Sequence, residues 1–213
     1  MQIALIPAAS LAAMPWKNGG GVTREIAADP PGAALDAFVW RVSVADVAQA
    51  GPFSRFVGID RTLVLLSGAG MLLDEAGEAG DSGRADSARG TQLHTHALTK
   101  PFDIARFAGE AQIDARLVDG ATRDFNLMVR RGAAIGEVDV WRGAGTHTIT
   151  ADTLLLFCAS GSLRVTPGAA APVALATSDT LRIEHAQALH CVCEGTGTVL
   201  AVRLQLQLQR PLT

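Results

Sequence analysis

Acidic, basic and hydroxyl side chains recur at alternate positions in three short segments of this sequence. Because successive side chains of a β-strand point to opposite faces, each segment would present its polar residues on one face. These residues are Thr23 and Glu25 in the first segment, Arg41 and Ser43 in the second, and Asp124, Asn126 and Arg130 in the third. Arg61 directly precedes a further apolar segment. The three faces are either ordinary solvated surfaces or the lining of one interior, and the sequence alone leaves both open.

If these faces line one interior, their charges must nearly balance, because an unpaired buried charge is very costly. The carboxylates of Glu25 and Asp124 oppose the guanidinium groups of Arg41, Arg61 and Arg130, which leaves one positive charge. A planar guanidinium binds a carboxylate through two parallel hydrogen bonds. The pattern therefore indicates a pocket for a small carboxylate, and the alternative is an enzyme in which Glu25 or Asp124 acts as general base.

A glycine-rich segment precedes the first of these strands. Residues 14–21 read Met-Pro-Trp-Lys-Asn-Gly-Gly-Gly, and glycine permits positive φ angles and close backbone approach. The segment is therefore either a turn that leads into an edge strand or a loop that contacts a ligand.

Helical periodicity is scarce, and short apolar or β-branched runs separated by Gly, Pro, Asp and Ser recur along the chain, which indicates an all-β fold. Turn signals about every ten residues favour a jelly roll or cupin. Residues 74–90 are small and charged and predict a long hairpin loop. The clearest predicted strands are Gln2–Ile6, Val39–Val44, Thr62–Ser67, Leu93–Leu98, Phe102–Phe107, Gln112–Val118 and Asp124–Arg130.

Two pairs of segments resemble each other in the same order along the chain. Thr62–Leu73 is similar to Thr153–Val165, and Gly109–Leu117 is similar to Gly195–Leu204. This weak internal repeat predicts two similar barrels, the second beginning near Ala133 and pairing back with N-terminal strands. The alternative is that apolar hairpins look alike without being related.

Composition excludes several classes of protein. The chain has 213 residues, 48% of them hydrophobic, and a net charge of −3, so it can bury a large core and carries no basic cluster for nucleic acid. No apolar run approaches the roughly 18 residues of a membrane helix, and the apolar N-terminus lacks the positive charge of a signal peptide. Three cysteines are few and odd in number, which favours a reducing cytoplasm over a disulfide framework.

His94 and His96 could form half of a metal site, since two imidazoles would share one strand face. Metal-binding cupins resemble this, but they follow the pair with a glutamate a few residues later, whereas here the next acids are Asp103 and Glu110. We therefore expect no metal and no cofactor. Cys191 and Cys193 also share a strand face, and buried apolar thiols are the favoured interpretation over a metal pair.

Five motifs together resemble the HutD/Ves-like family. They span most of residues 1–131 in the family's order, while the second half is similar only in length and strand character. The motifs are Met14–Ile26, Trp40–Ser43, Gly51–Phe56 with Gly58–Arg61, Lys100–Phe102 and Thr122–Arg131.

The resemblance implies an all-β, double-stranded β-helix (jelly-roll) fold of the RmlC-like cupin type, arranged as a bicupin. Residues 1–131 would form an N-terminal barrel that carries the motifs, and residues 132–213 a C-terminal barrel. The two barrels would be tightly packed together and could exchange strands. It also implies a metal-independent, small-molecule-binding regulatory protein linked to histidine utilisation, with a carboxylate of the urocanate or formylglutamate type as ligand. The alternative is an isomerase, lyase or hydrolase that acts on such a carboxylate.

The family's signature positions coincide with the polar faces, which predicts one ligand site in the N-terminal barrel. Trp16, Lys17 and Asn18 would lie at its mouth, with Thr23 and Glu25 inside. The full set is Trp16, Lys17, Asn18, Thr23, Glu25, Arg41, Ser43, Arg61, Asp124 and Asn126. No residue is assigned as catalytic. We further expect a cytoplasmic protein without nucleic-acid or membrane partners, and a homodimer formed through edge strands.

Overall fold

The computed structural model describes residues 1–76 and 93–207. Apart from a single 3-10 turn at Ala8–Ser10, regular structure in these ranges consists of β-strands, which confirms the predicted all-β class. Residues 74–76 of the predicted loop instead end the strand β7 (Met71–Ala76), and the rest of the predicted loop lies outside the described residues. The chain divides into two compact units, which are described separately below.

We call residues 14–23 and 44–128 the central unit, and residues 1–13, 24–43 and 129–213, which include both ends of the chain, the terminal unit. The units therefore consist of interleaved stretches of sequence. The predicted boundary between residues 131 and 132 stays a prediction.

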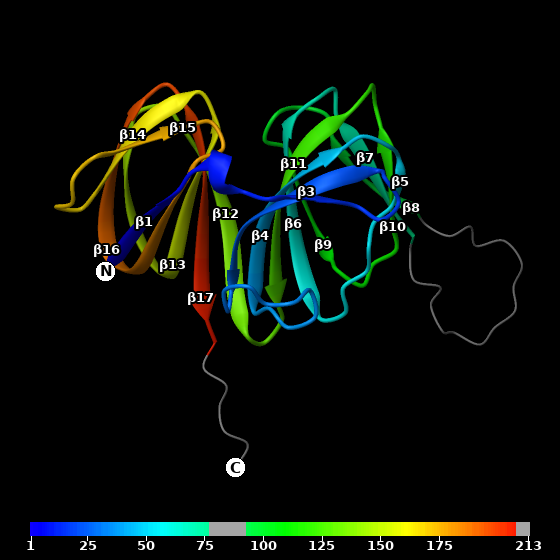
Figure 1. Cartoon of the computed structure of the whole chain (residues 1–213), viewed down its shortest axis with the longest axis horizontal. Coiled ribbons are helices and arrows are strands. Elements are labelled where there is room, and N and C mark those ends of the chain that lie inside the picture. Colours follow the sequence, from blue (N-terminus) through cyan, green and yellow to red (C-terminus); the bar gives the residue numbers. More distant parts are fainter. Residues whose placement is uncertain (77–92, 208–213) are drawn as a thin grey trace, which may run out of the picture. The chain divides into compact units, whose positions relative to one another are not determined.

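The central unit contains all of a four-stranded sheet and part of a six-stranded one (Figure 1). The four-stranded sheet has the order β5 (Gly51–Pro52), β10 (Ile113–Leu117), β7 (Met71–Ala76), β8 (Leu93–Leu98). The six-stranded sheet has the order β2 (Ala13–Pro15), β3 (Gly21–Asp29), β4 (Trp40–Val47), β11 (Thr122–Arg130), β6 (Ile59–Ser67), β9 (Ile104–Ala108).

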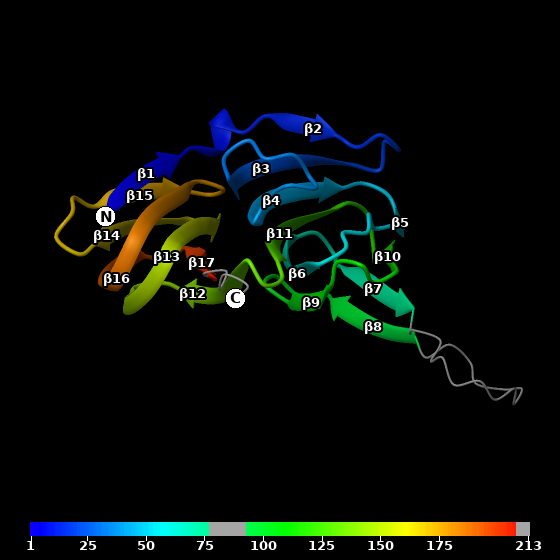
Figure 2. The same ribbon diagram turned by 90° about the horizontal axis from the view of Figure 1, so that it is seen from below.

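Apolar side chains from both sheets meet in one core within the central unit. Leu63 and Leu65 of β6 and Phe107 of β9 pack in the same cluster as Leu73 of β7 and Ile113 of β10. Figure 2 shows β4, β11, β6 and β9 on one side of this core and β5, β10, β7 and β8 on the other. Alternate residues of each strand point toward this core, and β4, β6 and β11 are largely buried on their other face as well.

The terminal unit is built around a seven-stranded sheet. Its strands follow the order β12 (Ala134–Arg142), β17 (Thr198–Leu206), β13 (Gly145–Ser160), β16 (Thr180–Gly195), β14 (Ser162–Pro167), β15 (Val173–Ala176), and β1 (Gln2–Ile6) also pairs with β16. In the β1–β16 ladder, Leu5 lies opposite Leu181. The N-terminal strand β1 thus pairs with β16, a strand of the second half of the chain.

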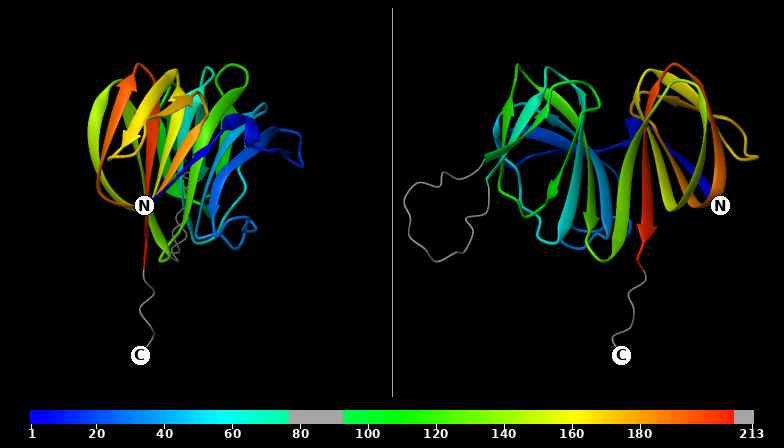
Figure 3. Two further views of the ribbon diagram at one scale, coloured as in Figure 1. Left: turned by 60° about the vertical axis from the view of Figure 1, so that its left-hand side comes forward. Right: turned by 180° about the vertical axis from the view of Figure 1, so that it is seen from behind.

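Two long strands allow this single sheet to curve around its own core (Figure 3). Strands β13 and β16 each contain 16 residues, and their register shifts between Ile149 and Ala151. Near the shift, His185 and Ala188 adopt positive φ angles of 56° and 46°. Such irregularities bend a strand and increase its twist. All six strands on the sheet's main path contribute buried residues to one cluster as a result.

The repeated segments are strand–turn–strand units, but neither is a hairpin. Strand β6 belongs to the six-stranded sheet and β7 to the four-stranded sheet, while β14 pairs with β15 and β16 rather than with β13. In the central unit, the turn carries the chain from one wall of the core to the other, because Leu65 and Met71 enter the core from opposite sheets. The apolar character of both strands reflects this shared core.

Candidate functional site

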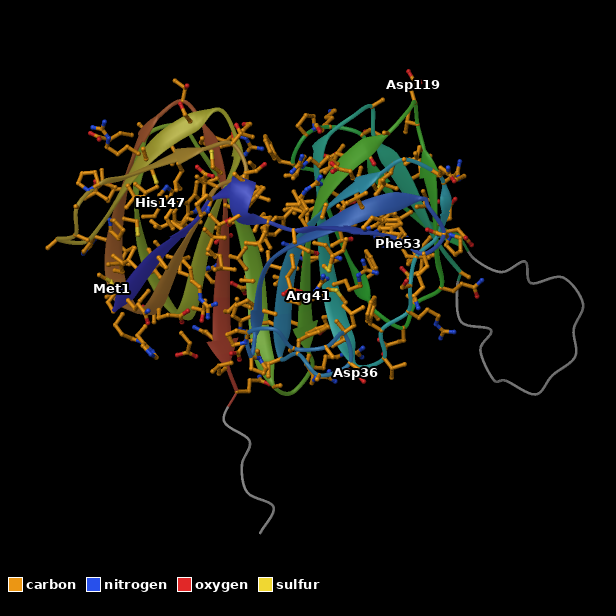
Figure 4. The ribbon with its side chains drawn as sticks, viewed as in Figure 1. Met1, Asp36, Arg41, Phe53, Asp119 and His147 are labelled. Carbon is orange, nitrogen blue, oxygen red and sulfur yellow. The ribbon has the colours of Figure 1, made fainter. Side chains whose placement is uncertain are left out.

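Arg61 is a buried cation surrounded by aromatic rings in the central unit. It lies on the face of β6 that also carries the core residue Leu63, and only 7% of it is exposed. Its Cζ atom lies 5.2 Å from the ring centroid of Phe53, 5.7 Å from that of Phe56 and 5.1 Å from that of Phe107. Figure 4 labels Phe53 beside β5. The rings stabilise the positive charge where water has little access.

Asp124 is a buried carboxyl group whose pKa is influenced by the charge of Arg61. It lies on β11, the neighbour of β6, and is 2% exposed. Burial raises the pKa of Asp124 to about 7, while Arg61 opposes this rise and Asp46 adds to it. Asp46 itself lies 3.6 Å from a guanidinium nitrogen of Arg123. A carboxyl group that titrates near neutral pH is suited to proton transfer or to proton-linked binding.

Three buried polar atoms on one face of β11 have no hydrogen-bond partner within residues 1–76 and 93–207. They are Oγ1 of Thr122, Oδ2 of Asp124 and Oδ1 of Asn126. Alternate residues of a strand share a face, so the three atoms form a polar row. Buried polar atoms in proteins are nearly always hydrogen-bonded, and exceptions mark positions where a ligand or water completes the set.

The glycine-rich segment forms a closed hairpin. The Trp16 amide donates to the Gly21 carbonyl (2.9 Å), and the Gly19 amide donates to the Trp16 carbonyl (3.0 Å). Oδ1 of Asn18 accepts a hydrogen bond from the Gly20 amide (3.0 Å). Lys17 and Asn18 are exposed on this turn. Asn18 therefore has a local structural role, which the ligand-site prediction did not anticipate.

Gly21 is required by close packing rather than by loop movement. A Cβ atom at this position would lie 2.6 Å from the carbonyl oxygen of Asp46 and 3.1 Å from the indole ring of Trp16. The same indole donates from Nε1 to Oγ1 of Thr23 at 2.8 Å. The Trp16 indole is thus hydrogen-bonded to Thr23, and the absence of a side chain at Gly21 leaves space for the indole ring.

Glu25, Arg41 and Ser43 meet in the terminal unit. Nε of Arg41 donates to Oε2 of Glu25 at 2.7 Å, and one terminal nitrogen of Arg41 lies 3.4 Å from Oγ of Ser43. The side chain of Arg41, labelled in Figure 4, is 7% exposed, and that of Glu25 is 29% exposed. The guanidinium charge is thus balanced by a carboxylate of the protein.

Arg130 does not take part in either group. Its Nε donates to the Phe38 carbonyl (2.9 Å), and a terminal nitrogen donates to the Asp36 carbonyl (2.7 Å). Its guanidinium also lies over the Phe38 ring, 5.8 Å from the centroid. Arg130 therefore holds the segment that precedes β4. It should no longer be counted among the positive charges of the pocket predicted from the sequence.

Sequence reasoning missed several residues that surround Arg61. Phe53 and Phe56 lie in a recognised motif, and Thr122 continues the alternation of Asp124 and Asn126, so a signal for these was present. Phe107 lay in a predicted strand without any feature that marked it.

His96 lies on β8 in the central unit and is half-buried, whereas the neighbouring His94 is exposed. Nε2 of His96 lies 3.1 Å from Oε2 of Glu75, and its ring centroid lies 6.0 Å from that of Phe107. In the described ranges, no three or more His, Cys, Asp or Glu side chains are arranged to hold a metal ion. Metal independence remains a prediction for chemical analysis.

The two cysteines that share a strand face, Cys191 and Cys193, are core residues of the terminal unit. Cys191 and Cys193 are buried as free thiols, which confirms the sequence-based interpretation. Burial, with a smaller effect of Cys193, raises the pKa of the Cys191 thiol to about 11. A thiol with so high a pKa is a poor nucleophile at neutral pH.

With this geometry established, comparison with known proteins places the chain. The HutD family profile matches residues 8–201. The protein belongs to the HutD family. The predicted resemblance to HutD and Ves proteins is thereby confirmed.

Several relatives of this HutD-family protein are known. An uncharacterized 21.2 kDa protein in the hutC 3'region of Pseudomonas putida is 36% identical over 183 residues, which cover 86% of this chain and 87% of that protein. Protein Ves of Citrobacter koseri is 36% identical over 128 residues, 59% of this chain and 56% of Ves. The gene position of the first relative links the family to the histidine-utilisation locus.

Solved structures agree with the fold. The structure of HutD from Pseudomonas fluorescens SBW25 matches with a TM-score of 0.78 at 30% identity, covering 96% of this chain and 99% of that one. Structures of much lower identity share the same all-β, cupin-like fold. No helix among the described residues is long and apolar enough to cross a membrane.

Proposed function

We propose that this HutD-family protein binds a small carboxylate of histidine utilisation, of the urocanate or formylglutamate type, and regulates the pathway rather than catalysing one of its steps. The proposed site lies in the central unit, on the face of the neighbouring strands β6 and β11 that carries Arg61 and Asp124. The observation that carries the proposal is the row of unpartnered polar atoms on Thr122, Asp124 and Asn126, beside the strand that carries the buried Arg61.

The charges around Arg61 favour an anionic ligand. Arg41 is balanced by Glu25, and Arg130 binds backbone carbonyls. Asp124 opposes Arg61, but with a pKa of about 7 it carries only a partial charge at neutral pH. When Asp124 is protonated, a ligand carboxylate can take its place as the anion next to Arg61, and the protonated carboxyl group can donate a hydrogen bond to that ligand.

The aromatic surroundings favour a small ligand that binds through its charge. Phe53, Phe56 and Phe107 cover the guanidinium and exclude water, which strengthens an interaction between charges. Thr122 and Asn126 add polar atoms that can orient a second polar group of the ligand. Urocanate and formylglutamate both carry a carboxylate and a further polar group, which is why we retain them.

Isothermal titration of the parent and of Arg61→Met with urocanate and with formylglutamate tests the proposal. Loss of a buried charged hydrogen-bonding group should weaken binding by at least about tenfold. The matched control is Arg106→Met, because Arg106 is exposed on β9 in the same unit. If neither compound binds the parent, or if Arg61→Met binds as tightly as Arg106→Met, Arg61 is not the anion site.

A second candidate function is a metal-independent enzyme that acts on the same carboxylate as an isomerase, lyase or hydrolase. The raised pKa of Asp124 favours it, because a general base works best when its pKa lies near the operating pH. Of the two predicted bases, Asp124 is therefore the stronger candidate, since Glu25 is occupied by Arg41. NMR of each ligand after incubation distinguishes the functions: turnover that Asp124→Asn abolishes would establish the enzyme, and binding without turnover supports the regulator.

We also propose a bicupin arrangement, a cytoplasmic location and a homodimer that binds neither nucleic acid nor membranes. The division into two compact units supports the first, and three free buried thiols support the second. Sedimentation equilibrium tests the dimer, and gel-shift and vesicle co-sedimentation assays test the excluded partners.

A further inference from the structure

The terminal unit contains a second aromatic site, formed by Trp141 and His147. Their rings are stacked face to face, with centroids 3.8 Å apart and planes 2° from parallel. Trp141 belongs to the core cluster of this unit and is 9% exposed, so its ring has a fixed position. His147, labelled in Figure 4, lies near the start of β13 and is half-buried. The imidazole therefore covers one face of a tryptophan that the core holds in place.

Little besides stacking holds the imidazole of His147. The ring makes no hydrogen bond to any residue in the described part of the chain. The position of Gly145 leaves room beside it, because a Cβ atom there would lie 3.3 Å from Nε2 of His147. Burial lowers the pKa of His147, against an opposing effect of Asp139, so the ring is neutral at physiological pH. A neutral ring held by one stacked contact can leave its position at small cost.

Charged groups lie on the same strand face as Trp141. Asp139 and Glu137 alternate with apolar residues on β12, and both carboxylates contact the guanidinium of Arg203, at 3.0 and 2.7 Å. Arg203 lies opposite Glu137 in the β12–β17 ladder. The Trp141 ring is thus a flat apolar surface, and polar groups lie along the strand that carries it. Small-ligand sites usually combine an apolar surface with a few polar groups in this way.

We propose that the face of Trp141 covered by His147 is a second ligand site. There the indole binds the planar ring of a small imidazole-bearing molecule, and His147 occupies that position in the free protein. The chain's own side chain demonstrates the fit, because an imidazole already lies parallel to the indole at stacking distance. An incoming imidazole would make the same contact while His147 turns outward about its side-chain bonds. The site does not involve Arg61.

The proposal predicts that His147 competes with the ligand. An aromatic stack of this kind stabilises weakly, so the competing ring should weaken binding by no more than about tenfold. His147→Ala should therefore bind free imidazole about tenfold more tightly than the parent does. A protein in which His147 only fills space would show no binding to either form.

NMR of the indole N–H groups measures this directly, because the chain has only three tryptophans, Trp16, Trp40 and Trp141. Free imidazole is added at pH 8 to the parent, to His147→Ala and to His190→Ala. Only the Trp141 signal, identified by its loss in Trp141→Phe, should shift, and it should saturate at lower concentration in His147→Ala. His190 is the control, because it is an exposed histidine on the adjacent β16, opposite Thr148. A non-aromatic ring of the same size, tetrahydrofuran, should leave the signal unchanged.

Three outcomes would overturn the proposal: no shift of Trp141 in His147→Ala, equal affinity in parent and His147→Ala, or no binding to the parent at a hundredfold higher imidazole concentration. His147→Gln serves as the second variant should His147→Ala fail to fold, since it retains a polar side chain at the same position. Formylglutamate carries no imidazole, so calorimetry with it reports on the Arg61 site alone, and failure here leaves that site standing.

Discussion

Nε of Arg41 lies 2.7 Å from Oε2 of Glu25, within a group that also includes Ser43. Strands β3 and β4, which carry the two residues, are neighbours in the six-stranded sheet. The pair is a cross-strand contact that neutralises a buried guanidinium. Arg41 is therefore already paired with a carboxylate of the protein, and the proposed anion site is assigned to Arg61.

Glu25→Gln should destabilise the protein, because it leaves the charge of Arg41 buried without its carboxylate. Removing one partner of a buried pair costs about 3 kcal/mol of the free energy of unfolding. Urea denaturation followed by circular dichroism measures the loss. Arg41→Met in the same background should recover part of it, because the unpaired charge is then removed.

The matched control for Glu25→Gln is Glu137→Gln. Glu137 also pairs with an arginine, Arg203 at 2.7 Å, but its side chain is 60% exposed. Exposed pairs contribute less than about 1 kcal/mol. If the two variants lose equal stability, burial of Arg41 does not determine the strength of its contact with Glu25.

Asp124 should make the protein less stable as pH rises from about 4 to about 7. Its pKa is raised from 3.8 to about 7 in the folded protein, so in this range the folded state binds more protons than the unfolded state does. The contribution of the protonated group is fully present below pH 4 and is lost as pH passes 7. At 1.36 kcal/mol per pKa unit, the change amounts to about 4 kcal/mol.

Asp124→Asn tests this pH dependence, since the amide resembles the protonated carboxyl group and does not titrate. The variant should be more stable than the parent at pH 8 and similar to it at pH 4, as measured by urea denaturation at each pH. Asp114→Asn is the control, because Asp114 is exposed on β10. A parent and an Asp124→Asn variant with the same pH profile would show that Asp124 ionises as readily as an exposed carboxyl group.

Apolar runs and alternation along the chain were together sufficient to predict most strands of the central unit. The predicted segments Thr62–Ser67, Leu93–Leu98 and Asp124–Arg130 fall within β6, β8 and β11. A strand with one face in a core has a period of two residues, which the sequence displays directly. The same pattern correctly placed Asp124 on a strand, but Arg61, expected just before the strand Thr62–Ser67, lies within β6, which begins at Ile59.

The residues that each buried arginine contacts could not be predicted from the sequence, because these contacts depend on which strands become neighbours. The sequence counted Arg41, Arg61 and Arg130 as equivalent cations, yet each has different surroundings: a carboxylate, three aromatic rings and two backbone carbonyls. The stacking of Trp141 on His147 was equally hidden, because alternation describes one strand at a time, and these residues lie on β12 and β13, which are not adjacent in the sheet.

Gly21→Ala should destabilise the hairpin before β3. The new methyl group would lie 2.6 Å from the Asp46 carbonyl oxygen, a backbone atom that cannot move without disturbing β4. Overpacking of this kind costs about 1–3 kcal/mol, and the displaced Trp16 ring should change its fluorescence. Gly20→Ala is the control, because its nearest contact is the exposed side chain of Asn18 at 3.3 Å. Equal thermal stability of the two variants would contradict the close packing at Gly21.

Binding of a carboxylate at Arg61 should be linked to one proton on Asp124. Above pH 7 the ionised Asp124 competes with the ligand for the same guanidinium, so the association constant should fall about tenfold per pH unit. Below pH 7, where Asp124 is already protonated, the affinity should change little. Asp46 lies near enough to raise the pKa of Asp124, and Arg61 lowers it, so the midpoint reports on all three groups.

Calorimetry in two buffers that differ in ionisation enthalpy counts the protons taken up on binding. At pH 8 the parent should take up close to one proton per ligand, whereas Asp124→Asn should take up none and should retain its affinity up to pH 9. Proton uptake that persists in Asp124→Asn would show that a group other than Asp124 takes up the proton on ligand binding. His96 is then the first to examine, because its ring packs 6.0 Å from that of Phe107, which also contacts Arg61. His96→Gln in the Asp124→Asn background would decide between the two.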